Sequence, residues 1–175
     1  MESIKELNKL LLGKAKKKIN ESKLGVSLKV EEIGDGSNAA YDKYEHSIKV
    51  NLRLIISGSR DEGINPEDYL EIVLCHELGH VIDPDLTFEE VNKIKAIKEK
   101  LNDGYERLDS LNVKDEEYIH LRERLNNTLS ELKKIEYPAE IRACHLGRRF
   151  VPDHLVELYD KHSEGTLKTY LASYE

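Results

Sequence analysis

The residues with the clearest chemical meaning are His76 and His80, four positions apart in the segment His-Glu-Leu-Gly-His. In an α-helix, two residues at this spacing differ by about 40° around the axis and by about 6 Å along it. Both imidazoles can therefore reach one metal ion. Glu77 follows the first histidine, and a carboxylate there can take a proton from the attacking water without being a ligand itself. The pattern predicts a hydrolytic zinc site with His76 and His80 as ligands and Glu77 as general base.

A helix over Pro66–Ile82 is predicted to carry this motif. Asn65 can cap the helix, and proline suits the first helical position. Pro84 disfavours helical geometry at the residue before it and so marks the end. The apolar residues just before the motif, Cys75 among them, should anchor the helix in the core. Without a metal, the two histidines would be ordinary, partly buried polar groups of this helix.

A third protein ligand is expected outside the motif, because catalytic zinc typically has three protein ligands and one position for water. The candidates by residue type are Glu140, Glu136, His145, Cys144, His120, His154 and Asp83. Asp83 falls seven residues after His76 on the same helical face, so it could ligate or orient a histidine. Glu140 is followed by the small residues Ala143 and Cys144, which would let its helix pack closely against the motif helix. That favours Glu140.

The elements that must position these residues are predicted from hydrophobic spacing. Apolar residues at helical steps predict an amphipathic helix over residues 2–22. Alternating apolar residues predict a small sheet of about three strands between residues 26 and 56. A strand at 47–54 could pair with an extended substrate. The fold class is therefore α+β.

Residues 87–135 are predicted to form a long helical hairpin. Apolar residues recur at steps of three and four on both sides of residues 112–114, and most other positions are charged. Each helix then has one narrow apolar seam, which suits an antiparallel pair. The hairpin would be an insertion between His80 and Glu140.

The C-terminal part is predicted to be helical as well. Pro138 is expected to break or kink the chain. Three short helices are expected after it, over residues 139–150, 153–159 and 167–174. The whole chain, residues 1–175, is predicted to be a single domain.

Composition limits the class of protein. With 175 residues, 39% of them hydrophobic and 35% charged, the chain can form one buried core. A formal net charge of −7 repels a phosphate backbone, so we expect no direct nucleic-acid partner. No apolar run approaches the roughly 18 residues that cross a bilayer, and the N-terminus lacks a secretory pattern. We therefore expect a cytoplasmic protein without a membrane partner, and with its two cysteines reduced.

Three stretches of the chain resemble the ImmA/IrrE-type zinc peptidases: Ser47–Leu54, Glu71–Ile82 and Glu140–Pro152. The resemblance implies a zincin-like fold, in which a small sheet packs on the HELGH helix. A later helix of that family has the form Glu-x-x-Ala, and Glu140 and Ala143 occupy those positions here.

The same resemblance implies a complete site. One Zn²⁺ per chain would be held by His76, His80 and Glu140, with Glu77 as the catalytic base. An oxyanion partner is also expected, with Tyr137 and His154 as candidates; that list stays open.

The leading interpretation is a zinc-dependent endopeptidase. Characterised peptidases of the resembled family cut transcriptional repressors of mobile elements or stress regulons in the cytoplasm, so the resemblance implies a protein substrate such as a helix-turn-helix repressor. A second interpretation is a zinc-containing binding or regulatory module that acts through its hairpin without proteolysis. An exposed apolar stripe on the hairpin would favour it. A zinc peptidase with Asp83 as ligand is disfavoured, because the Gly-Thr-x-x-Asp arrangement is absent.

Overall fold

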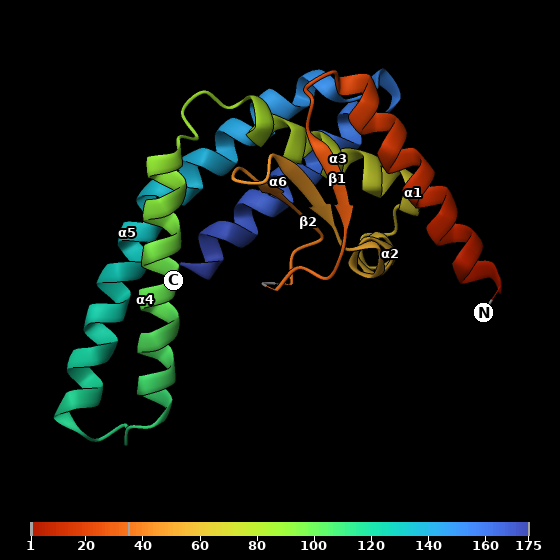
Figure 1. Ribbon diagram of the computed structural model, residues 1–175. Coiled ribbons are helices and arrows are strands. Elements are labelled where there is room, and N and C mark those ends of the chain that lie inside the picture. Colours follow the sequence, from red (N-terminus) through yellow and green to blue (C-terminus); the bar gives the residue numbers. More distant parts are fainter. Residues whose placement is uncertain (1, 35, 175) are drawn as a thin grey trace. The chain divides into compact units, whose positions relative to one another are not determined.

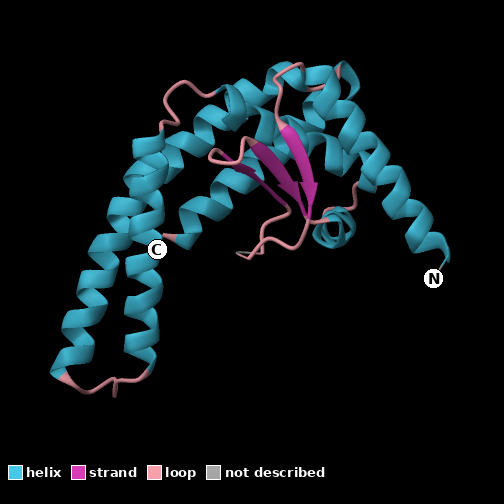
Figure 2. Cartoon of the chain, viewed as in Figure 1, coloured by secondary structure: helices cyan, strands magenta, loops and turns pink. Residues whose placement is uncertain are grey.

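The computed structural model describes residues 2–34 and 36–174, and its ribbon is shown in Figures 1 and 2. Within these residues the chain is mostly helical, with three short strands, so the α+β class is confirmed. The elements in chain order are α1 (Glu2–Ser22), β1 (Ser27–Val30), β2 (Ala39–Asp42), β3 (Ser47–Val50), α2 (Leu52–Asp61), α3 (Pro66–Ile82), α4 (Phe88–Asp109), α5 (Glu116–Gly147), the 3-10 turns η1 (Arg148–Phe150) and η2 (Asp153–Leu155), and α6 (Val156–Ser173). Among the described helices, none has the length and apolar character needed to cross a membrane.

The chain divides into two compact units. The first contains the residues up to Asp83 together with Arg142–Ser163, and the second contains Pro84–Ile141 with the residues from Glu164 on. Helix α5 passes from the second unit into the first, and α6 passes back. Compactness does not establish independent folding, so the single-domain prediction stays a prediction.

The sheet of the first unit has the order β1-β3-β2. β1 pairs with β3 in parallel, and β2 pairs with β3 antiparallel. The hypothesis that the strand at 47–54 pairs with an extended substrate is therefore wrong, because β3 is the central strand and both of its edges are occupied. The edge strands are β1 and β2.

The residues after β3 also differ from the prediction. The strand ends at Val50, and Leu52–Asp61 forms helix α2. Asn51 starts this helix, since its side chain accepts hydrogen bonds from the backbone N–H groups of Arg53 and Leu54 at 3.2 and 3.4 Å. Leu52 and Ile55 are both buried, and a spacing of three residues suits a helix better than a strand.

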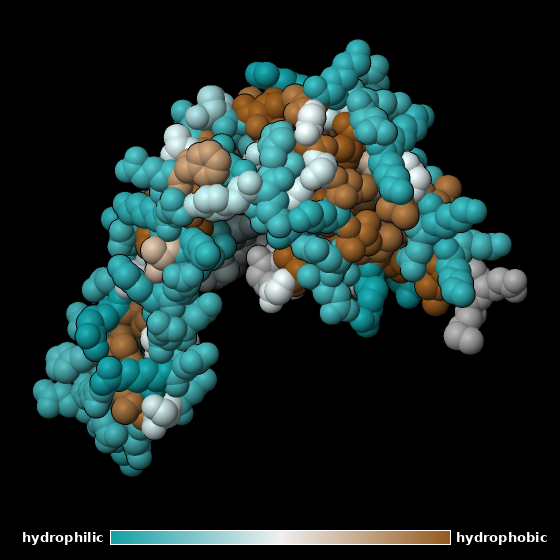
Figure 3. All heavy atoms as spheres, in the orientation of Figure 1, coloured by the Kyte–Doolittle hydropathy of each residue, from teal (hydrophilic) through white to brown (hydrophobic). Residues whose placement is uncertain are grey.

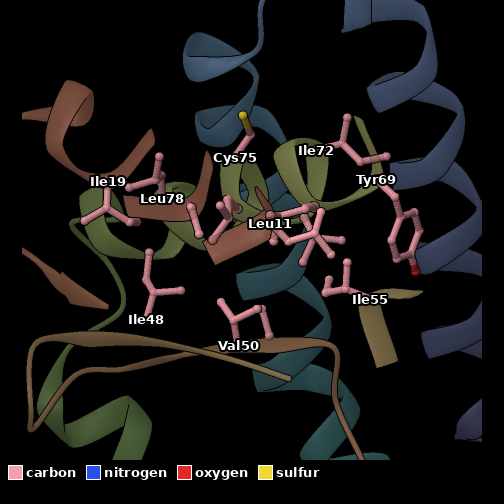
Figure 4. Packing of buried hydrophobic residues seen from close by; sticks show 14 of the residues in the cluster. Leu11, Ile19, Ile48, Val50, Ile55, Tyr69, Ile72, Cys75 and Leu78 are labelled. Carbon is pink, nitrogen blue, oxygen red and sulfur yellow. The ribbon is translucent and has the colours of Figure 1, made fainter. Parts of the chain in front are cut away.

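The core of the first unit forms around α3, whose predicted bounds of Pro66–Ile82 are confirmed. The side chain of Asn65 caps the helix by accepting from the backbone N–H of Glu67 at 2.8 Å. Figure 4 shows Ile72 of α3, Leu11 of α1 and Val50 of β3 within one buried cluster. Because α3 is buried along most of its length, its motif has a rigid foundation.

Helix α1 covers one side of this core, as predicted. Leu11, Ala15 and Ile19 recur every four residues and are buried. Two lysines hold α1 to α3 by ion pairs, since Lys14 and Lys18 both reach Glu71, at 3.7 and 3.1 Å. The predicted amphipathic helix over residues 2–22 is thus confirmed.

The second unit contains the predicted hairpin, formed by α4 and the first part of α5. Its own apolar cluster includes Ile97, Leu101, Leu121, Leu125 and Leu132. The helices approach closely where a Cβ on Gly104 would lie 2.3 Å from the Leu125 side chain. Figure 3 shows a mostly hydrophilic surface on the visible face of these helices.

Two predictions about the C-terminal part need correction. The predicted break at Pro138 is absent, because Pro138 lies inside α5, which continues to Gly147; a kink at Pro138, the other predicted outcome, stays a prediction. A proline inside a helix costs about 3 kcal/mol, and the buried residues on either side of it, such as Leu132 and Ala143, offset that cost through packing. Residues 156–173 form one helix instead of parts of two, because Tyr159 and Ser163 are buried one turn apart and keep the middle of α6 in place.

Candidate metal centre

The candidate site is built on a close contact between α3 and the last part of α5. A Cβ on Gly79 would lie 2.1 Å from the carbonyl oxygen of Ala143, and a Cβ on Gly147 would lie 2.4 Å from the carbonyl oxygen of Cys75. Real Cβ contacts are never this short, so both positions require glycine for this approach. Cys75, the earlier of the two α3 residues, contacts Gly147, the later of the two α5 residues. The two helices therefore run antiparallel here.

The two motif histidines lie one turn apart on α3. Their ring centroids are 4.9 Å apart and their planes are nearly perpendicular, at 86°. The Nδ1 atom of His76 lies 3.5 Å from the Sγ atom of Cys144 on α5. This contact continues the same antiparallel register, with His76 opposite Cys144 and Gly79 opposite Ala143.

Glu140 comes one turn before Cys144 on the uninterrupted helix α5. In an antiparallel register, one turn back along α5 corresponds to one turn forward along α3, from His76 to His80. The ligand atoms of His76, His80 and Glu140 accordingly lie within 4.8 Å of one another. The sequence prediction that these three residues come together agrees with the structure.

The donor set fits a divalent metal ion. An ion at the centre of a triangle with sides of 4.8 Å lies about 2.8 Å from each corner, and zinc bonds to nitrogen and oxygen are about 2.0–2.2 Å. Small side-chain rotations close this difference. Two imidazoles and one carboxylate are also a recurrent ligand set of catalytic zinc. The group could therefore hold a metal ion.

Glu77 follows His76 on α3 and is buried, with 6% of its surface exposed. It does not belong to the three-residue ligand group. Glu77 thus adjoins a candidate ligand in the sequence and lies outside the ligand group, and its role as general base stays a prediction.

Asp83 is paired with an arginine on α5. Both of its carboxylate oxygens accept from the Nε–H of Arg142, at 3.1 and 2.9 Å. The Asp83 side chain is fully buried. Asp83 is not part of the three-residue ligand group, which disfavours the ligand role.

Glu136 is also held away from a ligand role. Its carboxylate accepts from the Tyr174 hydroxyl at 2.7 Å and pairs with Lys98 at 2.5 Å. Burial and the neighbouring Glu136 carboxylate raise the pKa of Tyr174, so this tyrosine stays protonated and donates. Glu136 therefore has two donors of its own within the second unit.

Of the remaining candidates, Cys144 is buried but is not part of the ligand group, and the three histidines lie at the surface. His120 pairs with Glu116 on α5, and His145 and His154 are exposed. Of the two oxyanion candidates, Tyr137 is half-buried on α5 and His154 is exposed in η2. Neither placement tests an oxyanion role.

The sequence analysis missed Arg142 and Gly147. Gly147 follows Ala143 by four residues, and small residues at this spacing were the available signal for a close helix contact. Arg142 carried no local signal, because its partner is 59 residues away in the chain.

Comparisons with known proteins do not identify this chain. No protein-family model matches it, and neither the curated proteins nor the solved structures include a match. The site must be interpreted from its own chemistry.

Proposed function

We propose that this protein is a zinc-dependent endopeptidase. The observation that carries the proposal is the group formed by His76, His80 and Glu140, whose ligand atoms lie within 4.8 Å of one another. The buried Glu77 directly follows His76 in the sequence. A hydrolytic zinc enzyme needs these two things together, three protein ligands and a nearby carboxylate that is not a ligand.

Each residue has a separate part in hydrolysis. Zn²⁺, when bound, supplies a Lewis acid that polarises the scissile carbonyl and lowers the pKa of water. His76, His80 and Glu140 hold the ion and leave a position open. Glu77 takes a proton from the attacking water and returns it to the leaving amine, which is general base and then general acid catalysis.

An extended substrate can be bound at strand β2. The backbone N–H of Asn51 donates to the carbonyl of Asn38, so these two residues form a hydrogen-bonded pair of the antiparallel ladder. Hydrogen-bonded and non-hydrogen-bonded pairs alternate, and the backbone groups of Ala39 and Tyr41 therefore point away from β3. A peptide that pairs with this edge of β2 would form main-chain hydrogen bonds, which do not depend on the peptide's side chains. We therefore propose β2, instead of the strand at 47–54, as the strand that pairs with an extended substrate.

The substrate class follows from the resemblance to the ImmA/IrrE-type peptidases. We propose a cytoplasmic protein substrate, such as a helix-turn-helix repressor of a mobile element or stress regulon. Support comes from where the three similar stretches lie in the chain: they supply β3, α3 and the C-terminal part of α5.

The alternative, a binding module acting through the hairpin, lacks the feature expected of it. The exposed large apolar residues in the described part of the hairpin are Phe88, Tyr105, Val113 and Ile119. Phe88 and Tyr105 are 17 residues apart, which is about 25 Å along a helix. Val113 lies in the connection between α4 and α5, and Ile119 lies in the first turn of α5. A stripe would require exposed apolar residues at steps of three or four.

The proposal is tested with Glu77→Gln, which removes the base and preserves the shape of the side chain. We expect full zinc content, an unchanged melting temperature, and cleavage of an unstructured protein reduced by about 10²–10⁴-fold. Glu67→Gln is the matched control, because Glu67 lies in the first turn of the same helix and pairs with Lys14. Cleavage by Glu77→Gln at the rate of the control would reject the proposed base.

A further inference from the structure

An ion pair between a half-buried arginine and a fully buried aspartate joins the end of the motif helix to the helix that carries Glu140. Asp83 is the C-cap of α3, three residues after His80, and its side chain is fully buried. Arg142 lies on α5, two residues after Glu140. The Nε–H of Arg142 lies between both carboxylate oxygens of Asp83, at 3.1 and 2.9 Å.

Such a pair is a poor means of stabilising a fold. The desolvation of the buried Asp83 carboxylate and the partly buried Arg142 guanidinium offsets part of their attraction, and apolar side chains of similar volume often stabilise a fold as well as such a pair. The backbone contact at Gly79 and Ala143 already brings the helices together. Net stability alone therefore does not explain the pair.

The glycine contacts set the distance between α3 and α5 more firmly than they set the register along the helix axis. Small residues on both helices permit a close approach, but they lack the interlocking side chains that stop one helix from sliding along the other. A slip of one residue is about 1.5 Å along the axis. That shift is comparable to a zinc–oxygen bond of about 2.0–2.2 Å, so it would remove Glu140 from the ligand group.

A carboxylate and a guanidinium provide the missing restraint. Arginine has a rigid, planar head group, and its hydrogen bonds to a carboxylate depend on direction as well as distance. The pair lies beyond Gly79 on α3 and close to Glu140 on α5, at the end of the contact where a slip would matter for the ligands.

We propose that Asp83 and Arg142 are positioning residues that fix the register of α5 against α3, so that Glu140 meets His76 and His80. This inference rests on the proposed metal site and names what holds its third ligand in place. Neither residue touches the ion. Their effect is on the affinity and geometry of the site.

The test replaces the pair with apolar side chains of similar size, Asp83→Leu with Arg142→Met. Cobalt(II) is the probe, because its visible absorption reports the number and geometry of its ligands, and zinc affinity is measured by competition with a chromogenic chelator. We expect a melting temperature of the metal-free protein equal to or above that of the unsubstituted protein, together with a 10- to 100-fold loss of zinc affinity and an altered cobalt spectrum.

The matched control is the ion pair between Arg148 and Asp160. It has two hydrogen bonds, of 2.8 and 2.9 Å, and it joins η1 to α6 at the exposed surface. Arg148→Met with Asp160→Leu should leave zinc affinity within twofold. Arg142→Lys separates charge from geometry, because lysine keeps the charge and loses the planar head group. We expect this variant to lose at least tenfold in zinc affinity.

The outcomes separate the inference from the function on which it rests. Wild-type zinc affinity and an unchanged cobalt spectrum in the double variant would overturn the positioning role. A lower melting temperature of the metal-free double variant together with the loss of zinc affinity would also overturn the positioning role, because the pair would then be an ordinary part of the core. If the double variant does not fold, Arg142→Lys decides, and unchanged affinity in it rejects the inference. Absence of zinc binding by the unsubstituted protein would instead reject the proposed metal site itself.

Discussion

The carbonyl oxygen of Ala143 lies 2.1 Å from the position that a Cβ atom on Gly79 would occupy. Gly79 is the fourth residue of the His-Glu-Leu-Gly-His motif, so the motif supplies a contact surface in addition to ligands and a base. The two histidines face the metal position, and the glycine between them lets α5 come close enough for Glu140 to join them.

Gly79→Ala should consequently damage both stability and metal binding. The added methyl group meets backbone atoms that cannot rotate away, and overpacking of this kind costs about 1–3 kcal/mol. Urea denaturation measures the cost. Gly13→Ala is the matched control, because nothing lies within 4 Å of a Cβ there, and alanine in a helix should stabilise by about 0.5–1 kcal/mol. Equal stability of the two variants would contradict the close contact of α3 and α5.

Cys75 should be unreactive in the folded protein. Burial raises the pKa of its thiol to about 11, so at pH 8 only about 0.1% is thiolate, the reactive form. The shift favours the neutral thiol in the folded state, and the stability linked to it is lost as the pH rises from the unfolded pKa towards 11. Mass spectrometry after iodoacetamide treatment should find Cys75 modified only after unfolding. Rapid modification of the native protein would mean that α3 is less buried than described.

The distal hairpin should be dispensable for the metal site. Gly104 and Leu125 pack together, so replacing residues 105–124 by a short Gly-Ser turn joins two positions that are already close. The shortened protein retains Ile97, Leu101 and Leu132 of the hairpin cluster. We expect unchanged zinc content and unchanged cleavage of an unstructured protein, with slower cleavage of a folded substrate. Loss of zinc would show that the hairpin is required for the metal site. If the shortened and full-length proteins cleave a folded substrate at equal rates, the distal hairpin has no role in selecting folded substrates.

Local chemistry made some elements predictable and left others beyond reach. The bounds of α3 follow from Asn65, Pro66 and Pro84, which act within a few residues of themselves. Helix α2 was missed because Leu52 and Ile55 are compatible with a short strand, and the cap at Asn51 was not used as a signal. Pro138 was expected to break or kink the chain, and the helix continues through it because tertiary packing overrides local propensity there.

The same distinction holds for the site. His76, Glu77 and His80 belong to one helix, so their mutual geometry follows from helical spacing alone. Glu140 is 60 residues after His80 in the sequence, and among several candidates only packing could single it out. The central position of β3 and the pair of Asp83 with Arg142 depend on strand order and helix register, which no local pattern encodes.

Zinc content, measured by elemental mass spectrometry on the purified protein and on three variants, tests the central claim most directly. We expect about one zinc per chain in the unsubstituted protein and in Glu136→Gln, because Glu136 is held by Lys98 and Tyr174. Glu140→Gln and His80→Ala should lose most of the metal, since each removes one of three ligands. Full zinc content in Glu140→Gln, or loss of zinc in Glu136→Gln alone, would contradict the proposed centre.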